Sequence, residues 1–292
     1  HDHMSAESKP NKVIFTDNLP ALAQLNTGSV QLIYIDPPFN TGHTQKRTQM
    51  RTTRSKHGDR TGFKGEKYRT ERIGSESFED DFKDFQAFIK PRLVEAQRIL
   101  SPTGSLYFHI DYREAHYCKV LLDQIFGREN FLNEIIWAYD YGARPKKKWP
   151  PKHDNILLYV RERENYFFDA DAVERIPYMA PGLVGKEKAA RGKLPTDTWW
   201  HTIVSPTGKE KTGYPTQKPL GVLRRIVQAS SRPGDLVLDF FAGSGTTGAA
   251  ALELGRRFIL MDHNPAAIRV MRKRFTGQVV EFCGADGKLL PD

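Results

Sequence analysis

The sequence predicts an α/β fold with a mostly parallel β-sheet, and three observations support this prediction. Short apolar runs rich in β-branched residues, such as Val30–Ile35, alternate with segments that repeat apolar residues at helical spacing, such as Leu220–Ser230. Several apolar runs end at an aspartate, and ligands of open α/β sheets bind at the carboxyl ends of the strands. A glycine-rich turn at residues 243–248 joins one such run to an alanine-rich helix.

Composition restricts the classes of protein to which the chain can belong. Its 292 residues are 39% hydrophobic, and no apolar run approaches the ~18 residues that cross a bilayer. The two cysteines, Cys118 and Cys283, cannot form a disulfide framework, and no cysteine–histidine cluster predicts a metal site. We therefore expect a cytoplasmic protein that uses no metal and contacts no membrane. The net charge of +9 favours a polyanionic partner.

The N-terminal part begins with two predicted strands, at residues 13–15 and 30–35, and a helix between them at residues 18–25. Asp17 follows the first strand. The second strand runs directly into residues 36–39, which read Asp-Pro-Pro-Phe. Neither proline can donate a backbone hydrogen bond, and each fixes φ at about −65°. We therefore expect a stiff turn that presents an acid, backbone carbonyls and an aromatic ring at the sheet edge.

Residues 40–77 show almost no apolar periodicity and are predicted to form a long basic loop. Between residues 43 and 77 there are ten lysines and arginines against four acidic residues. A loop of this length in a compact domain is usually functional or disordered. Because it starts beside the Asp-Pro-Pro-Phe turn, we expect it to close over a polyanion, with Arg47, Arg51 and Arg54 as contacts. The alternative is a solvated excursion without a ligand.

The next segment returns to regular structure. Apolar residues at helical spacing predict a helix over residues 78–100, which Pro91 either kinks or divides in two. Further elements follow by the same criteria: strands at residues 105–110, 131–137 and 155–161, and a helix at residues 112–126 that Gly127 ends.

Two irregular segments lie around the strand at residues 155–161. The first, at residues 139–154, mixes basic and aromatic residues, which suits phosphate contacts and base stacking. The second, at residues 162–213, interrupts the alternating pattern, and we interpret it as an inserted recognition region outside the sheet core. A solvated surface loop is the alternative for the first. The expected nucleic-acid contacts in it are Arg144, Lys146, Lys147, Lys148 and Trp149.

The C-terminal part predicts a nucleotide-binding βαβ unit. A helix at residues 220–230 precedes a buried strand at 236–239, the glycine turn, a helix to about residue 254, a strand at 257–261 that ends at Asp262, and a helix at 265–275. The pattern G-x-G-x-x-G normally indicates a dinucleotide, so a nicotinamide-dependent oxidoreductase is one hypothesis. However, Asp239 directly before the turn would repel a pyrophosphate and attract an amine. S-adenosylmethionine fits better, because its ammonium can pair with a carboxylate and its ribose hydroxyls with Asp262.

Three motifs together resemble the amino-methyltransferases of DNA. They are Asp-Pro-Pro-Phe at residues 36–39, Pro-Thr-Gln-Lys-Pro at 215–219 and Asp-Phe-Phe-Ala-Gly-Ser-Gly-Thr at 239–246. Their order is similar to the β group of that family, in which the catalytic motif precedes the cofactor motif. The resemblance implies a Rossmann-like S-adenosylmethionine-dependent methyltransferase sheet with permuted motif order. Residues 5–140 would be its catalytic part, 141–213 the target-recognition region and 214–292 the cofactor-binding part.

The resemblance also implies a role for individual residues. Asp262 would bind the ribose hydroxyls, although the family more often has glutamate there, and Asp17 would recognise the cofactor adenine. Thr216 and Lys218 would lie near the methionine end. The target base would be held by Asp36, Pro37, Pro38 and Phe39. The cofactor loop would consist of Asp239, Phe240, Phe241, Ala242, Gly243, Ser244, Gly245 and Thr246.

The implied activity is methylation of adenine N6 in double-stranded DNA, because the family usually has Asp at the first catalytic position for adenine and Ser for cytosine. N4-cytosine methylation is the alternative within the family. The resemblance further leads us to expect a homodimer, a nucleoid-associated location in a prokaryotic cell and a restriction–modification role with a cognate restriction enzyme.

Overall fold

The computed structural model describes residues 9–38, 49–54, 60–61, 67–73, 78–204 and 208–292. Within residues 39–82 it describes the backbone only. The chain forms two compact units. Residues up to 37 and from 92 to 292 form the larger unit, and residues 38–91 form the smaller one.

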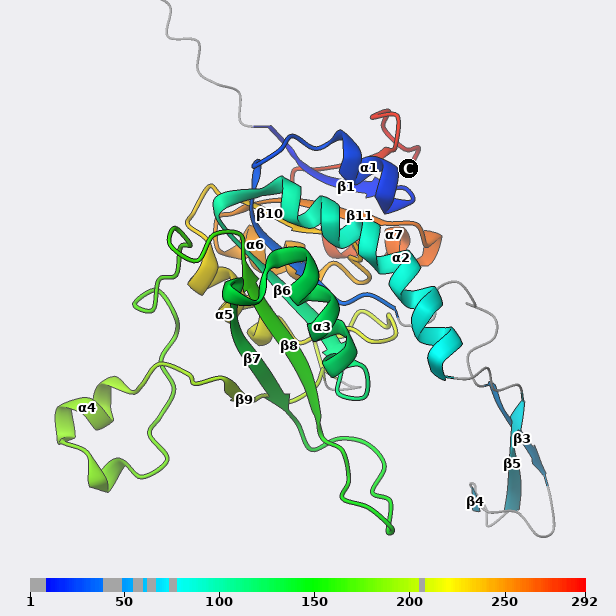
Figure 1. Cartoon of the computed structure of the whole chain (residues 1–292), viewed down its shortest axis with the longest axis vertical. Helices are drawn as coiled ribbons and strands as arrows, with labels where there is room; N and C mark the ends of the chain where they lie inside the picture. The colour runs from blue at the N-terminus through cyan, green and yellow to red at the C-terminus, as the bar shows by residue number, and fades with distance from the viewer. Residues whose placement is uncertain (1–8, 39–48, 55–59, 62–66, 74–77, 205–207) are drawn as a thin grey trace, which may run out of the picture. The chain divides into compact units, whose positions relative to one another are not determined.

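The larger unit is built on one sheet. Its strands are β1 Asn11–Phe15, β2 Val30–Ile35, β6 Leu100–Asp111, β7 Phe131–Ala138, β8 His153–Val160, β9 Thr198–Trp200, β10 Leu236–Asp239, β11 Arg257–Asp262 and β12 Val280–Gly284. They follow the order β12-β1-β11-β10-β2-β6-β8-β7-β9 (Figure 1). The strands from β12 to β6 are parallel, β8 is antiparallel to both neighbours, and β9 is parallel to β7. The predicted mostly parallel α/β sheet is therefore confirmed.

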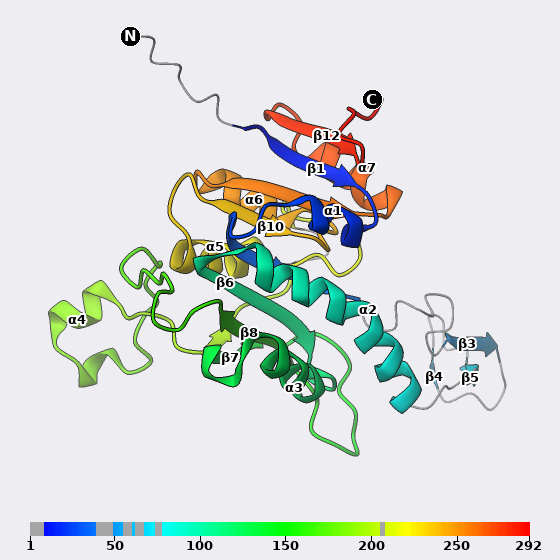
Figure 2. The same cartoon turned by 45° about the horizontal axis from the view of Figure 1, so that its top comes forward.

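The helices are α1 Asn18–Gln24, α2 Phe78–Ile99, α3 Ala115–Phe126, α4 Lys186–Arg191, α5 Leu220–Ser230, α6 Thr246–Glu253 and α7 Pro265–Arg274. Helices lie on both faces of the sheet, whereas α4 has no buried residue and lies apart from it (Figure 1). Successive residues of β8 face opposite sides of the sheet: Leu158 joins the core cluster that contains Val222 and Leu223 of α5, whereas the Tyr159 hydroxyl donates to the Lys119 carbonyl of α3. Figure 2 shows the positions of α3 and α5 next to this sheet. Strand β2 is buried along its whole length, as expected for a central strand with helices on both faces.

The structure corrects the prediction for residues 40–77. Instead of one irregular loop, the segment contains three antiparallel strands, β3 Gln49–Arg54, β4 Arg60–Thr61 and β5 Lys67–Ile73. The sequences of these strands are mostly polar, so they lack the alternation of apolar and polar residues by which strands are recognised. Their threonines and Tyr68 nevertheless favour an extended backbone.

Two further elements differ from their predictions. Residues 162–213 were interpreted as a recognition region outside the sheet core, but β9 pairs with β7 at the end of the strand order and Trp199 is only 7% exposed. A strand of three residues is too short to show a periodic pattern. Strand β12 was not predicted. Of the two alternatives at Pro91, the structure excludes the division, because α2 continues through Pro91 as one helix. Among the described residues, no helix is both long enough and apolar enough to cross a membrane.

Candidate active site

Acidic side chains are concentrated at one edge of the sheet. Five neighbouring parallel strands, in the order β1, β11, β10, β2 and β6, each end at or just before an aspartate: Asp17, Asp262, Asp239, Asp36 and Asp111. Register pairs Val237 and Leu238 of β10 with Leu32 and Ile33 of β2. As the sequence predicts, the fold therefore brings Asp36 and Asp239 to adjacent strand ends, although they come from opposite ends of the chain.

The glycine turn lies between β10 and α6, and its backbone conformation and close packing require glycine at two positions. Gly243 and Gly245 have φ values of +56° and +80°, which residues with a Cβ rarely adopt. A Cβ on Gly245 would lie 2.8 Å from Cγ of Met271 in α7. A Cβ on Gly243 would lie 3.3 Å from the ring of Tyr214, a residue that the sequence analysis did not single out. The turn therefore packs closely against α7 at Gly245 and against the Tyr214 ring at Gly243.

Asp239 is built into this turn. Its side chain is 3% exposed, one carboxylate oxygen accepts from the Phe241 N–H at 3.0 Å, and the other accepts from the Thr247 hydroxyl at 2.6 Å. Burial raises the pKa of Asp239 to about 7, and the charges of Asp36 and Asp262 add to this effect while the two hydrogen bonds oppose it. This carboxylate thus has a structural role that the sequence pattern did not indicate.

Asp262 supports the same turn from the neighbouring strand. Its carboxylate accepts from the Gly243 N–H at 2.9 Å and from the Asn264 N–H at 2.8 Å. Burial, followed by the charge of Asp262, raises the pKa of Tyr214. Asp262, Asn264 and Tyr214 therefore form one polar wall beside Gly243.

The Pro-Thr-Gln-Lys-Pro segment lies against the glycine turn, because the Thr246 hydroxyl donates to the Lys218 carbonyl at 3.2 Å. Thr216 is exposed and has a φ of +62°, the one positive φ at a non-glycine position in the described chain. The Lys218 ammonium lies 2.8 Å from the Asp36 carboxylate. The sequence predicted Lys218 near the cofactor and gave no sign of this ion pair.

The remaining residues of the Asp-Pro-Pro-Phe turn are described only in part. Pro37 is buried and Pro38 is partly buried. Phe39, like Arg47 in the predicted basic loop, lies outside the described residues. Arg51 and Arg54 belong to β3, which is described by its backbone.

Asp17 contacts a residue that the sequence analysis missed. Its carboxylate is 68% exposed and lies 3.1 Å from the Arg92 guanidinium. Arg92 also donates to the Asn18 side chain, which in turn donates to the Phe240 carbonyl at 2.7 Å. Burial lowers the pKa of Arg92, while the Asp17 charge acts in the opposite direction. This chain of contacts ties the start of α1 to the turn after β10.

A second missed feature is a buried polar network behind Asp36. The Tyr34 hydroxyl is 2.7 Å from Nδ1 of His109, and Nε2 of the same ring is 2.8 Å from Asp154. The Tyr139 hydroxyl donates to the other Asp154 oxygen at 2.9 Å. Tyr34 and His109 are 2% and 1% exposed. The network spans strands β2, β6 and β8 and the end of β7, so no local motif could reveal it.

The loop between β7 and β8 leaves the sheet at the same edge. The Tyr139 N–H donates to the Lys152 carbonyl at 2.9 Å, and the Lys152 ammonium donates to the carbonyls of Tyr141 and Ala143. Arg144 forms an ion pair with Asp140. The tip is exposed, with Trp149 at 93%. One loop, held by these hydrogen bonds and this ion pair, therefore carries the predicted contacts Lys146, Lys147, Lys148 and Trp149.

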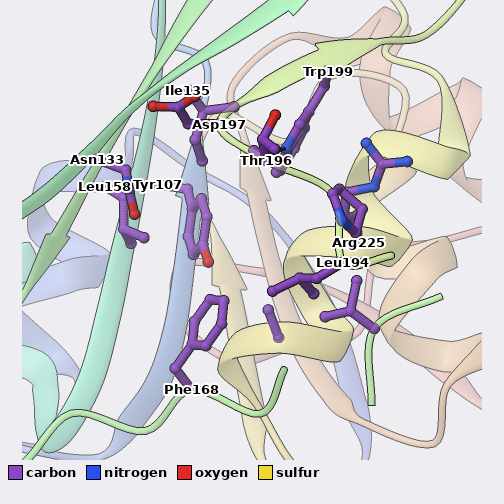
Figure 3. Close-up of a pocket in the computed structure, with 13 residues that line it drawn as sticks. Tyr107, Asn133, Ile135, Leu158, Phe168, Leu194, Thr196, Asp197, Trp199 and Arg225 are labelled. Atoms are coloured by element: carbon purple, nitrogen blue, oxygen red, sulfur yellow. Dashed lines mark hydrogen bonds between the residues drawn. The ribbon is translucent and has the colours of Figure 1, made fainter. Parts of the chain in front are cut away.

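A separate cavity of about 370 Å³ lies in the larger unit. Figure 3 shows Tyr107, Phe168, Leu194, Trp199 and Arg225 among the side chains around it. Its wall contains none of the residues predicted for the active site.

Comparisons with known proteins give a family match, related sequences and similar solved structures. The profile of a DNA methylase family of N6 and N4 methyltransferases matches residues 30–273. DNA adenine methyltransferase YhdJ of Escherichia coli (strain K12) is 29% identical over 275 residues, which cover 90% of this chain and 81% of that protein.

Two solved structures show the same fold. The cytosine-N4-specific PvuII DNA methyltransferase aligns with a TM-score of 0.63 and 16% identity, over 92% of this chain and 89% of that one. M1.HpyAVI in complex with SAM aligns with a TM-score of 0.57 and 20% identity, over 91% of this chain and 98% of that one.

Proposed function

Because the chain belongs to the DNA methylase family of N6 and N4 methyltransferases, we propose that it transfers the methyl group of S-adenosylmethionine to N6 of adenine in double-stranded DNA. One observation carries the proposal: Asp36 of the Asp-Pro-Pro-Phe turn and the glycine turn follow adjacent parallel strands. The acceptor site and the donor site then share one edge of the sheet. Nothing in this arrangement favours a nicotinamide-dependent oxidoreductase.

The residues of the glycine turn fit the cofactor. Gly243 brings the backbone of the turn close to the Tyr214 ring, and Asp262 offers acceptors for ribose hydroxyls. Asp17 lies farther along the same edge, where the cofactor adenine would bind. When bound, S-adenosylmethionine supplies an electrophilic methyl group on a sulfonium. The chain itself has to orient the cofactor, bind the target amine and exclude water.

Asp36 and Pro37 supply two hydrogen-bond acceptors for the target amine. The exocyclic amine of a paired adenine lies inside the stack, so the base must first be flipped out. One amine N–H can then donate to the Asp36 carboxylate and the other to the Pro37 carbonyl, with the Phe39 ring stacked on the base. Two acceptors out of the amine plane favour a pyramidal nitrogen with a localised lone pair. Catalysis on this account consists of positioning and electrostatic stabilisation.

The choice of base rests on Asp36. A carboxylate accepts strongly from an amine and suits N6 of adenine, and the relative YhdJ is described as an adenine methyltransferase. The second candidate is N4 of cytosine, because the family includes both activities and the PvuII enzyme with the same fold is cytosine-N4-specific.

Nucleoside analysis tests the proposal. The protein is incubated with methyl-labelled S-adenosylmethionine and unmethylated amplified DNA of mixed sequence, which is then digested for mass spectrometry. We expect label in N6-methyladenine. Label in N4-methylcytosine would select the second candidate, and unlabelled DNA would contradict both.

The loop between β7 and β8 is proposed to contact DNA. Three lysines at its tip suit phosphates, and the exposed Trp149 indole suits stacking on a base. We expect Trp149→Ala to weaken DNA binding about tenfold, because stacking contributes roughly 1–3 kcal/mol per base. Fluorescence anisotropy measures this effect, and Tyr117→Ala, at an aromatic residue of α3 that is 48% exposed and lies outside residues 141–213, is the control. Equal affinities for wild type and Trp149→Ala would contradict the proposed contact.

The Asp239 carboxylate gives cofactor binding a pH dependence. Its pKa is raised to about 7, so it is mostly protonated at pH 6 and mostly ionised at pH 7.5. If the cofactor ammonium is attracted by the ionised form, affinity for S-adenosylmethionine rises with pH, by roughly eightfold over this interval. Isothermal titration calorimetry at both pH values measures the change, and Asp239→Asn should remove it. A pH-independent affinity in wild type would contradict the role of this charge.

A further inference from the structure

Lys218 contacts residues of both proposed sites. Its backbone carbonyl accepts from the Thr246 hydroxyl, at the end of the glycine turn, at 3.2 Å. Its ammonium lies 2.8 Å from Oδ2 of Asp36, in the Asp-Pro-Pro-Phe turn. This one residue therefore connects the turn after β10 with the turn after β2.

The backbone around Lys218 is fixed by its neighbours. The Gln217 side chain accepts from the N–H and the hydroxyl of Thr212, at 2.8 Å and 2.9 Å, and donates to the Glu210 carbonyl at 2.8 Å. The Glu210 carboxylate in turn accepts from the Leu220 N–H at 2.5 Å. These hydrogen bonds hold the chain on both sides of Lys218.

The same segment contains a strained backbone position. Thr216 has a φ of +62°, which is unfavourable for a residue with a branched Cβ. Conformations of this kind persist where the surrounding contacts determine them, and they are concentrated at functional sites. The contact with the glycine turn is fixed as well, because the Thr246 hydroxyl accepts from the Arg274 guanidinium at 3.0 Å. The position from which the Lys218 side chain starts is thus determined by the fold.

The ion pair itself is largely shielded from water but still open to a ligand. The Lys218 side chain is 18% exposed and that of Asp36 is 28% exposed. Burial by itself lowers the pKa of Lys218, but the charge of Asp36 and the hydrogen bond to it, together with the charge of Asp154, raise it. The ammonium therefore stays charged, and the Asp36 carboxylate can still be reached from outside.

This pairing determines how Asp36 can serve the target amine. A carboxylate at a strand end can rotate, so its oxygens have no fixed direction without a partner. Lys218 engages Oδ2, which leaves Oδ1 for the amine N–H. A carboxylate that is paired with an ammonium is also a weaker base, so it can accept a hydrogen bond from the amine without removing a proton before transfer.

We propose that Lys218 is a positioning residue of the acceptor site: its backbone is anchored at the glycine turn, and its ammonium holds Oδ2 of Asp36 so that Oδ1 faces the target amine. The effect on the amine rests on the proposed function. The contacts of Lys218 with Asp36 and Thr246 do not, because they concern only groups of this chain.

The first test measures the ion pair without any substrate. In protein with isotope-labelled lysine, the Lys218 side-chain signal, assigned by its absence in Lys218→Met, is titrated by NMR. We expect Asp36→Asn to lower the pKa of Lys218 by at least about 0.5, because the paired anion is removed. Asp123→Asn is the matched control, since Asp123 pairs with Lys119 at 2.7 Å and is 21% exposed. It should leave the titration of Lys218 unchanged.

The second test is single-turnover methyl transfer. Lys218→Met removes the charge and keeps most of the side-chain volume. It should slow transfer at least about tenfold at saturating cofactor and DNA, while the Kd for S-adenosylmethionine stays within about twofold. In an Asp36→Asn background the same substitution should change the rate less than about twofold, because it acts through Asp36. Lys119→Met breaks an ion pair of similar exposure on α3 and should keep the wild-type rate.

Several results would overturn the proposal: an unchanged titration of Lys218 in Asp36→Asn, a wild-type rate in Lys218→Met, or rate losses that multiply in the double variant. A Lys218→Met protein that loses only cofactor affinity would instead assign Lys218 to the methionine end of the cofactor. Wild-type protein that methylates no DNA would overturn the proposed function, while the titration would still decide whether Lys218 holds Asp36.

Discussion

Replacement of Asp36 by alanine is expected to lower methyl transfer by at least about a thousandfold, because the acceptor that orients the target amine and stabilises developing charge is lost. Cofactor affinity should stay within about threefold of wild type, since the cofactor contacts proposed at Asp17, Asp262 and the glycine turn do not include Asp36. Single-turnover kinetics with labelled S-adenosylmethionine and calorimetry measure the two quantities.

The control for this variant is Asp111→Asn at the end of the neighbouring strand β6. Asp111 is paired with Arg113 at 2.9 Å and is 39% exposed, and it has no role in the proposed chemistry. It should retain wild-type transfer. An Asp36→Ala protein that kept wild-type turnover would show that the Asp-Pro-Pro-Phe turn is not the acceptor site.

Gly245→Ala is expected to have the largest effect on stability and cofactor binding. With φ at +80°, any Cβ costs about 1–2 kcal/mol of backbone strain. At this position the new methyl group would also lie 2.8 Å from Met271 Cγ and 3.3 Å from the Phe275 ring. Overpacking of this kind adds roughly 1–3 kcal/mol to the loss in unfolding free energy. Because the turn is the proposed cofactor site, affinity for S-adenosylmethionine should fall at least about tenfold.

Gly277→Ala separates strain from overpacking. Gly277 has the same φ of +80°, but no atom lies within 4 Å of a Cβ built there. Denaturant unfolding should therefore show the strain cost alone for Gly277→Ala, with unchanged cofactor affinity. Equal losses of stability for the two variants would mean that the glycine turn does not need close contact with α7.

The parts of the site that the sequence predicts are those encoded by neighbouring residues. Asp36–Pro37 follows a buried strand, and Asp239 with Gly243 and Gly245 forms a contiguous motif. Two proline constraints and two positive φ values are local properties, so residue types alone indicate them. The expectation that Asp36 and Asp239 share one edge of the sheet follows from the rule that ligands bind at the carboxyl ends of parallel strands, and the pairing of β2 with β10 is what the structure adds.

The polar network could not be predicted in this way. Tyr34, His109, Tyr139 and Asp154 are one residue each from separate segments, and only the pairing of β6 with β8 brings the last of them to the site edge. The ion pair of Lys218 with Asp36 has the same origin. In the same way, β3 to β5 form through pairing between polar segments, which leaves no periodic signal along the chain.

The most direct test of the central claim is a crystal structure of the protein with duplex DNA and S-adenosylhomocysteine. We predict an adenine flipped out of the duplex with N6 within about 3.2 Å of an Asp36 carboxylate oxygen, and with the cofactor sulfur beside the turn at Gly243 and Gly245. A target base bound away from Asp36, or a cofactor bound in the cavity beside Tyr107 and Trp199, would contradict the account.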